Sequence, residues 1–189
     1  MSALPWGRMR ALVLDVDGVL TDGGLWVGAD GSVTKRFFVR DGSGIVRLQR
    51  AGVPVCWLTG RADPAVRKRA EELGIKRLVE GSHDKADALR SLALGLGCSL
   101  DEIAYVGDDL LDLPAVRLVG LSVAPADAAD AVQAEVDYVS TLKGGYGVVR
   151  WVCGVCGVCG VCGVGRSWGV CVNTPRRQTF NFRYRNIPR

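Results

Sequence analysis

Short apolar segments alternate with helical patterns along the first 150 residues of the chain. Segments 10–15, 53–58 and 103–106 are near-continuous apolar runs, and each is followed by a turn that contains glycine. Runs of this kind are typical of strands that are buried on both faces of a parallel sheet. Shorter candidate strands lie at 77–80, 120–123 and 137–139.

Apolar residues at helical spacing fill the segments between these candidate strands. The clearest helix is predicted at 64–73, where Pro64 follows Asp63 and Gly74 ends the pattern. Further helices are predicted at 44–50, 85–94, 114–119 and 126–134. Strands and helices in alternation predict an α/β fold, a Rossmann-like parallel sheet with helices on both faces and right-handed crossovers.

Residues 24–39 break the alternation. Two β-rich stretches, 24–28 and 32–39, flank the dipeptide Asp30-Gly31, which is typical of hairpin turns. A hairpin that projects from an α/β sheet exposes its aromatic side chains unless another surface covers them, so we predict an interface here. The alternative is a hairpin folded back on its own domain. The aromatic side chains concerned are Trp26, Phe37 and Phe38.

Composition narrows the class of protein. The chain has 189 residues, of which 48% are hydrophobic and 23% charged, which suits one folded domain with an extension. We find neither an apolar run of transmembrane length nor a secretory signal, so we expect a cytoplasmic protein with no membrane partner. Residues 151–189 hold six Arg and no acidic residue, while residues 1–150 are slightly acidic. Charge therefore gives no support for a nucleic-acid partner.

The cysteines divide the chain at the same point. Cys56 and Cys98 lie among apolar or small residues and are interpreted as buried, reduced thiols, whereas the other five lie beyond residue 150. There the tripeptide Val-Cys-Gly is repeated four times from Val152. Cysteines three apart can bind zinc or an iron–sulfur cluster, but identical tripeptides favour a low-complexity tail. We expect a domain at 9–150 and an atypical tail at 151–189, and removal of the tail should preserve assembly and activity.

Carboxylates follow the first strand. Asp15 and Asp17 are two residues apart, so both side chains can project into one cleft from an extended chain. Neighbouring carboxylates repel one another unless a cation lies between them or one of them is protonated. Mg²⁺, which prefers oxygen ligands, would meet that requirement. The alternative interpretation is a solvated turn rich in Asp and Gly.

Polar residues also follow the other strands. The hydroxyl of Thr59 and the backbone at Gly60 can hold a phosphate oxygen, and Lys85 could neutralise a phosphoryl group, although a single lysine is more often a solvated surface charge. Ligands of open α/β sheets bind at the carboxyl ends of the strands, where these residues lie. Three more carboxylates follow the strand at 103–106, those of Asp108, Asp109 and Asp112.

Together these residues resemble a known family. Four segments are similar to the motifs of the haloacid-dehalogenase superfamily of phosphatases: Asp15-Val-Asp-Gly-Val-Leu-Thr-Asp-Gly23, Leu58-Thr-Gly-Arg61, Lys85 and Gly107-Asp-Asp-Leu-Leu-Asp112. The hairpin and three further segments resemble the 3-deoxy-D-manno-octulosonate 8-phosphate phosphatases, which lack a large cap domain. These three are Phe38-Val-Arg-Asp-Gly42, Gly120-Leu-Ser-Val-Ala124 and Lys143-Gly-Gly145.

The resemblance implies a Mg²⁺-dependent phosphomonoesterase that acts on a phosphorylated 2-keto-3-deoxy sugar acid. Asp15 would attack phosphorus and form an aspartyl-phosphate, and Asp17 would act as general acid and then as general base. Thr59, Gly60 and Lys85 would hold the phosphoryl oxygens.

The resemblance also implies a metal site and substrate contacts. Asp15, Asp108 and the backbone carbonyl of Asp17 would hold Mg²⁺. Asp109 would orient a water or support the ion indirectly, and Asp112 is grouped with Asp109 in this supporting role. The contacts to the sugar-acid carboxylate would come from Arg40 and Arg61, for which surface or structural ion pairs are an equally open interpretation.

The resemblance also bears on assembly and on substrate specificity. In relatives the hairpins build a homotetramer in which a neighbouring subunit closes each active site. Relatives commonly carry Gly-Gly-Arg-Gly where this chain has Gly144-Gly-Tyr-Gly147, which weakens the assignment of the sugar. One alternative is a phosphatase of another sugar-acid phosphate, such as a nonulosonate 9-phosphate. Another is a non-catalytic scaffold or metal-binding protein that uses the Cys-rich tail, although the retained set of motif residues favours an enzyme.

Overall fold

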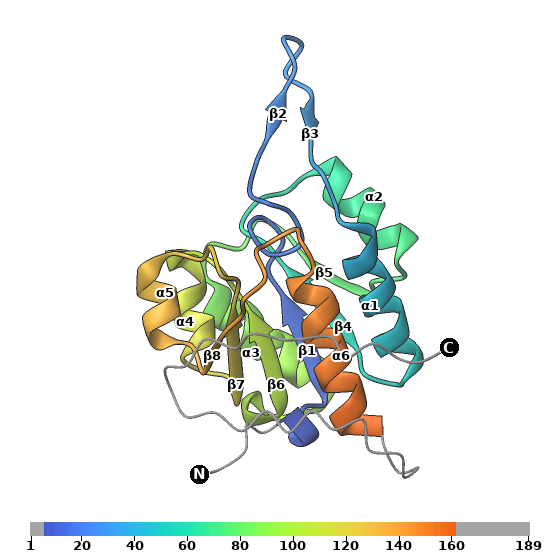
Figure 1. Cartoon of the computed structure of the whole chain (residues 1–189), viewed down its shortest axis with the longest axis vertical. Helices are drawn as coiled ribbons and strands as arrows, with labels where there is room; N and C mark the ends of the chain where they lie inside the picture. Colours follow the sequence, from blue (N-terminus) through green and yellow to red (C-terminus); the bar gives the residue numbers. More distant parts are fainter. Residues whose placement is uncertain (1–5, 162–189) are drawn as a thin grey trace, which may run out of the picture.

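A computed structural model describes residues 6–161 of the chain. Its main sheet has six parallel strands in the order β5-β4-β1-β6-β7-β8 (Figure 1). The strands are β1 Ala11–Leu14, β4 Val55–Leu58, β5 Arg77–Val79, β6 Ile103–Val106, β7 Leu121–Ala124 and β8 Tyr138–Val139. The predicted α/β fold with a parallel sheet is confirmed.

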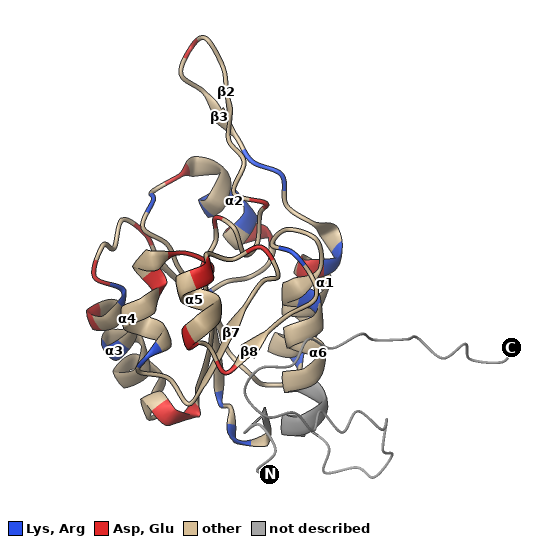
Figure 2. Cartoon of the chain, turned by 60° about the vertical axis from the view of Figure 1, so that its left-hand side comes forward, with Lys and Arg blue, Asp and Glu red and all other residues tan. Residues whose placement is uncertain are grey.

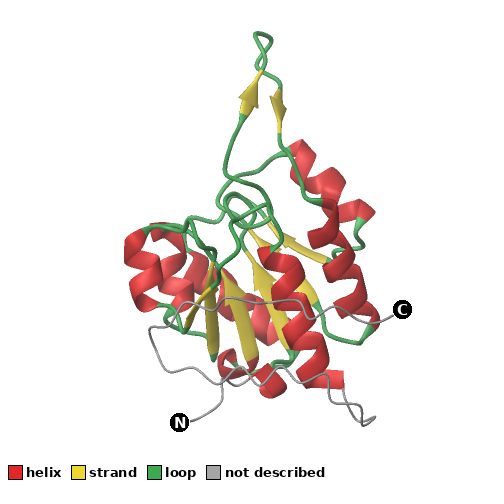
Figure 3. Cartoon of the chain, viewed as in Figure 1, coloured by secondary structure: helices red, strands yellow, loops and turns green. Residues whose placement is uncertain are grey.

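Helices cover both faces of this sheet (Figure 3). One face packs against α1, α2 and α6, and the other packs against α3 and α4. Among residues 6–161, no helix is long and apolar enough to cross a membrane. The helices are α1 Val39–Arg50, α2 Pro64–Glu72, α3 Lys85–Leu96, α4 Leu113–Val116, α5 Asp130–Glu135 and α6 Val148–Val161, with 3₁₀ turns η1 Trp6–Arg8, η2 Leu100–Glu102 and η3 Leu110–Asp112.

Strand β1 lies in the middle of the sheet and is buried along its whole length. Leu12 and Leu14 belong to the core between the sheet and α1, α2 and α6, whereas Ala11 and Val13 belong to the core on the α3 side. Alternate residues of a strand point to opposite faces, so a strand covered on both faces needs an unbroken apolar run.

Helix α1 begins at Val39, five residues before the predicted start, and the second hairpin strand is correspondingly shorter than predicted. Gly42 and Gly44 are poor helix formers, which hid the first turn from the sequence pattern. Packing against α6 explains the helix: a side chain at residue 44 would approach the Cα atom of Arg150 to 3.0 Å. The carboxylate of Asp41 also accepts the backbone N–H groups of Gly147 and Arg150 at the start of α6.

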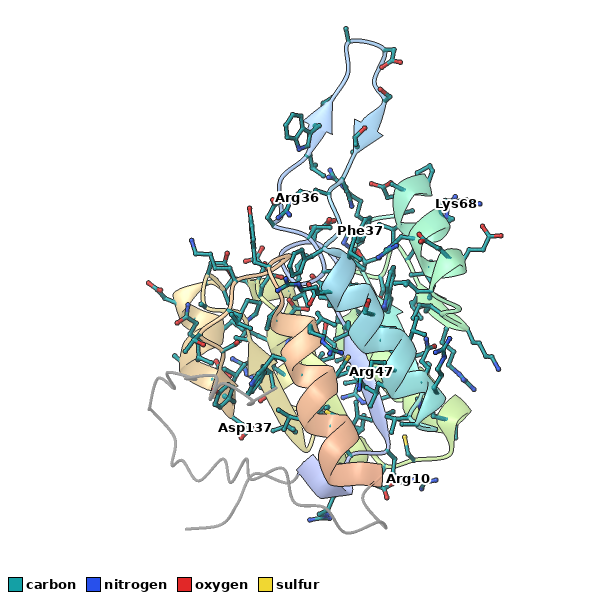
Figure 4. All side chains as sticks on the ribbon, turned by 45° about the vertical axis from the view of Figure 1, so that its right-hand side comes forward. Arg10, Arg36, Phe37, Arg47, Lys68 and Asp137 are labelled. Carbon is teal, nitrogen blue, oxygen red and sulfur yellow. The ribbon has the colours of Figure 1, made fainter. Side chains whose placement is uncertain are left out.

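The hairpin consists of β2 Trp26–Val27 and β3 Val33–Thr34, and it projects from the domain rather than folding back on it (Figure 1). Trp26 is 72% exposed, as expected. The expectation for Phe37 is wrong, because this ring stacks on buried Trp57 with centroids 6.3 Å apart and packs on the core. Figure 4 shows Phe37 at the base of the hairpin, where the chain returns to the domain.

Helix α6 crosses the expected domain boundary at residue 150. Val149, Val152, Cys153 and Cys156 are buried, and their spacing places them on one face of the helix toward the sheet. The first Val-Cys-Gly tripeptides therefore supply core residues as part of a regular helix. The expectation of a low-complexity tail for residues 162–189 lies outside the described residues.

Because of this packing, we now expect removal of residues 151–189 to destabilise the protein. The cut exposes core that Val152, Cys153 and Cys156 cover, so the free energy of unfolding should fall by at least about 3 kcal/mol. Urea denaturation of residues 1–150 and of residues 1–161 measures this, and the longer chain should have the higher free energy of unfolding. Equal stability of both truncated chains would contradict the role of α6 in the core.

Candidate active site

Polar residues from four chain segments meet at the carboxyl-end edge of the sheet, beneath the hairpin. Asp15 follows β1, Thr59 follows β4, Asp108 follows β6 and Lys85 opens α3. Figure 2 shows acidic loops in this region and a basic stretch where the hairpin runs into α1. Parallel strands bring their carboxyl ends to one edge, which explains how residues far apart in sequence become neighbours here.

Lys85 connects the carboxylates. Its Nζ atom lies 2.7 Å from Oδ1 of Asp15 and 2.6 Å from Oδ1 of Asp112, and all three side chains are buried. Burial disfavours the ammonium, but the two carboxylates outweigh it and raise the pKa of Lys85. Lys85 is therefore a buried cation held at the first strand end, and the alternative of a solvated surface lysine is wrong.

Asp112 organises the loop after β6. Its Oδ1 also accepts the hydroxyl of Tyr105 at 2.5 Å, and its Oδ2 accepts the backbone N–H groups of Asp108 and Asp109 at 2.9 and 3.1 Å. With Lys85, four donors occupy this one carboxylate. Asp112 is thus committed to holding its neighbours in place, although its oxygens lie near those of Asp15 and Asp108.

Asp15 and Asp108 form a pocket of oxygen donors that fits a divalent cation. Carboxylate oxygens of Asp15, Asp108 and Asp112 lie within 4.8 Å of one another, and Oδ1 of Asp108 is buried without a hydrogen-bond partner. A buried polar atom without a partner is costly, and an oxygen-only donor set suits Mg²⁺. Gly18 allows this approach, because a side chain there would collide with the Asp108 carboxylate, and its φ of +86° also favours glycine.

The two carboxylates are hard to ionise without such a cation. Burial, followed by the charges of Asp15 and Asp112, raises the pKa of Asp108 to about 8. Burial and the charge of Asp112 raise the pKa of Asp15 to about 6, although Lys85 acts in the opposite direction. The repulsion expected between clustered carboxylates is therefore present at this edge.

Asp17 points to a different partner. Its carboxylate, 29% exposed, pairs with the Nζ atom of Lys35, whose side chain is 0% exposed. Lys35 also contacts Oδ2 of Asp63 at 3.1 Å. Sequence reasoning missed Lys35. The only local signal was its place two residues from both Val33 and Phe37, which is the spacing of one face of an extended chain.

The phosphate-binding candidates lie at the end of β4. Thr59 is buried, its hydroxyl accepts the backbone N–H of Arg61 at 3.3 Å, and Gly60 follows in the same turn. Arg61 and Arg40 are exposed, and no ion pair forms for either within the described residues. The guanidinium of Arg40 lies 5.9 Å from the centre of the Phe38 ring.

Two further positions have local partners. The carboxylate of Asp109 accepts the backbone N–H of Leu110 at 2.7 Å and caps η3. The ring of Tyr146, within the segment 144–147, lies beneath the guanidinium of Arg36, which is 4.3 Å from the ring centre. Arg36 also donates to Asp22 and to the carbonyl of Gly145, so a cation lies over the Tyr146 loop.

Comparison with known proteins agrees with the fold. The haloacid dehalogenase-like hydrolase family matches residues 77–152, which gives the class of protein. The 3-deoxy-D-manno-octulosonate 8-phosphate phosphatases of Yersinia pestis and Escherichia coli K12 are each 44% identical to the chain over 146 residues, covering 77% of this chain and 78% of theirs. This chain belongs to the 3-deoxy-D-manno-octulosonate 8-phosphate phosphatase family.

Solved structures agree with this assignment. The crystal structure of the Yersinia pestis phosphatase matches with a TM-score of 0.80 at 42% identity, over 82% of this chain and 83% of that chain. The phosphatase of Moraxella catarrhalis, solved with a magnesium ion, a phosphate ion and a KDO molecule, matches with a TM-score of 0.80 at 38% identity. That match covers 82% of this chain and 89% of the other.

We expect magnesium affinity to rise with pH. The ion binds ionised carboxylates, and the pKa of Asp108 is about 8 and that of Asp15 about 6 in the metal-free protein. Below pH 8 binding must displace a proton from Asp108, so affinity should increase by up to about tenfold per pH unit between pH 6 and 8. Isothermal titration calorimetry across this range measures the effect. The Asp108→Asn variant should bind weakly at every pH, and a pH-independent affinity of the wild type would contradict the prediction.

Proposed function

We propose that this chain is a Mg²⁺-dependent phosphatase that hydrolyses 3-deoxy-D-manno-octulosonate 8-phosphate through an aspartyl-phosphate on Asp15. The observation that carries the proposal is the buried contact of Lys85 with Asp15, beside the unpartnered oxygen of Asp108. The names of the relatives supply the substrate, and the Moraxella catarrhalis structure supplies the cofactor. The scaffold alternative loses support, because Cys153 and Cys156 are buried in the core.

The reaction uses Asp15 and Asp17 in sequence. A carboxylate oxygen of Asp15 attacks phosphorus, and the bond from phosphorus to the sugar oxygen breaks while Asp17 protonates that oxygen. Water then attacks phosphorus, Asp17 takes a proton from it, and phosphate leaves as the Asp15 carboxylate is restored. Lys85 holds Asp15 in place and lies where it can also contact the phosphoryl oxygens.

Asp15, Asp108 and the backbone carbonyl of Asp17 would hold Mg²⁺. The bound ion offsets the negative charge of the nucleophile and of the phosphate. Asp112 supports this arrangement through Lys85 and through the backbone of Asp108 and Asp109.

Substrate contacts come from the surrounding turns. The hydroxyl of Thr59 and the backbone of Gly60 would join Lys85 around the phosphoryl group. Arg40 and Arg61 would bind the sugar-acid carboxylate, and their exposed guanidinium groups form no ion pair in the described part of the chain that would compete with substrate.

The Asp15→Asn variant tests the nucleophile. We expect phosphate release from 3-deoxy-D-manno-octulosonate 8-phosphate to fall by at least about 10³-fold, because the amide cannot form the aspartyl-phosphate. The control variant is Asp101→Asn. Asp101 lies in η2, just before β6 begins and so at the end of the strand opposite to the site, and this variant should retain full activity.

EDTA should abolish activity and Mg²⁺ should restore it. A nonulosonate 9-phosphate in the same assay examines the alternative substrate, and near-wild-type turnover by Asp15→Asn would refute the mechanism.

We also propose a homotetramer assembled through residues 24–39. The argument is the apolar surface of the projecting hairpin, where Trp26 is 72% and Val27 67% exposed, with Leu25 and Val33 partly exposed beside them. A two-stranded hairpin cannot bury large apolar side chains by itself, so another surface is needed to cover them. Soluble homo-oligomers usually have closed symmetry, which favours a second copy of this chain as that surface.

The variant Trp26→Ser with Val27→Ser should be monomeric in light scattering at concentrations where the wild type is a tetramer, because it removes most of the apolar contact area. Leu94→Ser is the control, since Leu94 is 85% exposed on α3, away from the hairpin. A monomeric wild type would refute the assembly.

A further inference from the structure

Lys35 lies at the base of the hairpin, where the chain runs from β3 toward α1, and it is buried. Its side chain has 0% exposure, and an ammonium group is stable in a protein interior only when it is paired. The partners are Asp17 and Asp63. The Nζ atom lies 2.8 and 2.9 Å from the two carboxylate oxygens of Asp17 and 3.1 Å from Oδ2 of Asp63.

Asp63 anchors this contact to the body of the domain. Its carboxylate caps α2 by accepting the backbone N–H of Ala65 at 2.8 Å, and its own N–H donates to Glu80 at 3.0 Å. Asp63 therefore holds Lys35 from a fixed position. Asp17 is the more exposed of the two carboxylates, at 29% against 5%, so it is the one open to the site.

We propose that Lys35 is a positioning residue, which orients the carboxylate of Asp17 toward the oxygen that leaves phosphorus. This inference rests on the acid–base role proposed for Asp17 above. The ammonium donates a hydrogen bond to Oδ2 of Asp17 and lies 2.8 Å from Oδ1, so rotation of the carboxylate is restricted before substrate binds. General acid catalysis requires the protonated carboxyl group of Asp17 to lie within hydrogen-bond reach of the leaving oxygen. Without Lys35 this carboxyl group would sample other orientations.

The chemistry gives this role a signature. When the phosphorus–oxygen bond breaks, its electron pair goes to the leaving oxygen. A sugar alkoxide is too basic to leave without the proton from Asp17, whereas p-nitrophenolate is a stable anion and leaves without one. Loss of Asp17 orientation should therefore lower kcat/KM for a sugar phosphate and spare kcat/KM for p-nitrophenyl phosphate, since kcat/KM covers the steps up to departure of the leaving group.

The experiment compares Lys35→Gln with wild type on both substrates. We expect kcat/KM for 3-deoxy-D-manno-octulosonate 8-phosphate to fall by about 10²-fold, and kcat/KM for p-nitrophenyl phosphate by less than about threefold. Lys35→Arg, which keeps the cation, should recover at least about a tenth of the activity. Asp17→Asn should show the same split, and adding Lys35→Gln to it should change little. Lys68→Gln, exposed on α2, should behave as wild type.

Other outcomes contradict the proposal. An equal fall in kcat/KM on both substrates would show that Lys35 only stabilises the fold. An unchanged kcat/KM on both would show that Asp17 is oriented without Lys35. Loss of Lys35 leaves the carboxylates of Asp17 and Asp63 without their cation. If Lys35→Gln fails to fold for this reason, the double variant Lys35→Met with Asp63→Asn, which removes the charge of Asp63, is compared with wild type on the same two substrates. If the wild type hydrolyses another alkyl phosphate but not the sugar-acid phosphate, the proposed substrate is wrong. The Lys35 comparison is then made with that alkyl phosphate in place of the sugar-acid phosphate. A wild type active only on the aryl ester would refute both proposals.

Discussion

The site depends on one buried contact, the ammonium of Lys85 between the carboxylates of Asp15 and Asp112. A buried charge is stable only with a partner of opposite charge, so removal of Lys85 would leave both carboxylates uncompensated in the interior. With Asp108 beside them, the ionised cluster has three carboxylates and one ammonium, an excess of two negative charges. A divalent cation is the counterion that balances this excess. Without it, burial and then the charges of Asp15 and Asp112 raise the pKa of Asp108.

The same cluster connects the candidate active site to the hydrophobic core. Asp112 receives the hydroxyl of Tyr105, which is buried on the α3 side of β6, and it holds the backbone of the loop that carries Asp108. Residues of the core and of the site are therefore in one hydrogen-bonded unit. This continuity explains how the edge of a parallel sheet can hold Asp15, the proposed nucleophile, in a defined position.

The hairpin has a comparable double role. Val33 is exposed on the projecting part, Lys35 is buried against Asp17, and Phe37 stacks on Trp57 in the core. Within the five residues from Val33 to Phe37, the chain therefore runs from the surface proposed for assembly, past the site, into the hydrophobic core. A segment tied down at Lys35 and Phe37 can present an otherwise unsupported hairpin to a neighbouring subunit without loosening the site.

The sequence by itself determined the parallel α/β fold, the projecting hairpin and the positions of the carboxylates after the strands. Those features depend on local signals, namely unbroken apolar runs, Asp-Gly turns and the two-residue spacing of Asp15 and Asp17. The roles proposed for Arg40 and Arg61 stay predictions. Only the tertiary structure decided the early start of α1, the extension of the core into α6 and the burial of Lys35. Each depends on contacts between distant segments, such as Asp41 with Arg150, 109 residues apart, which no local pattern records.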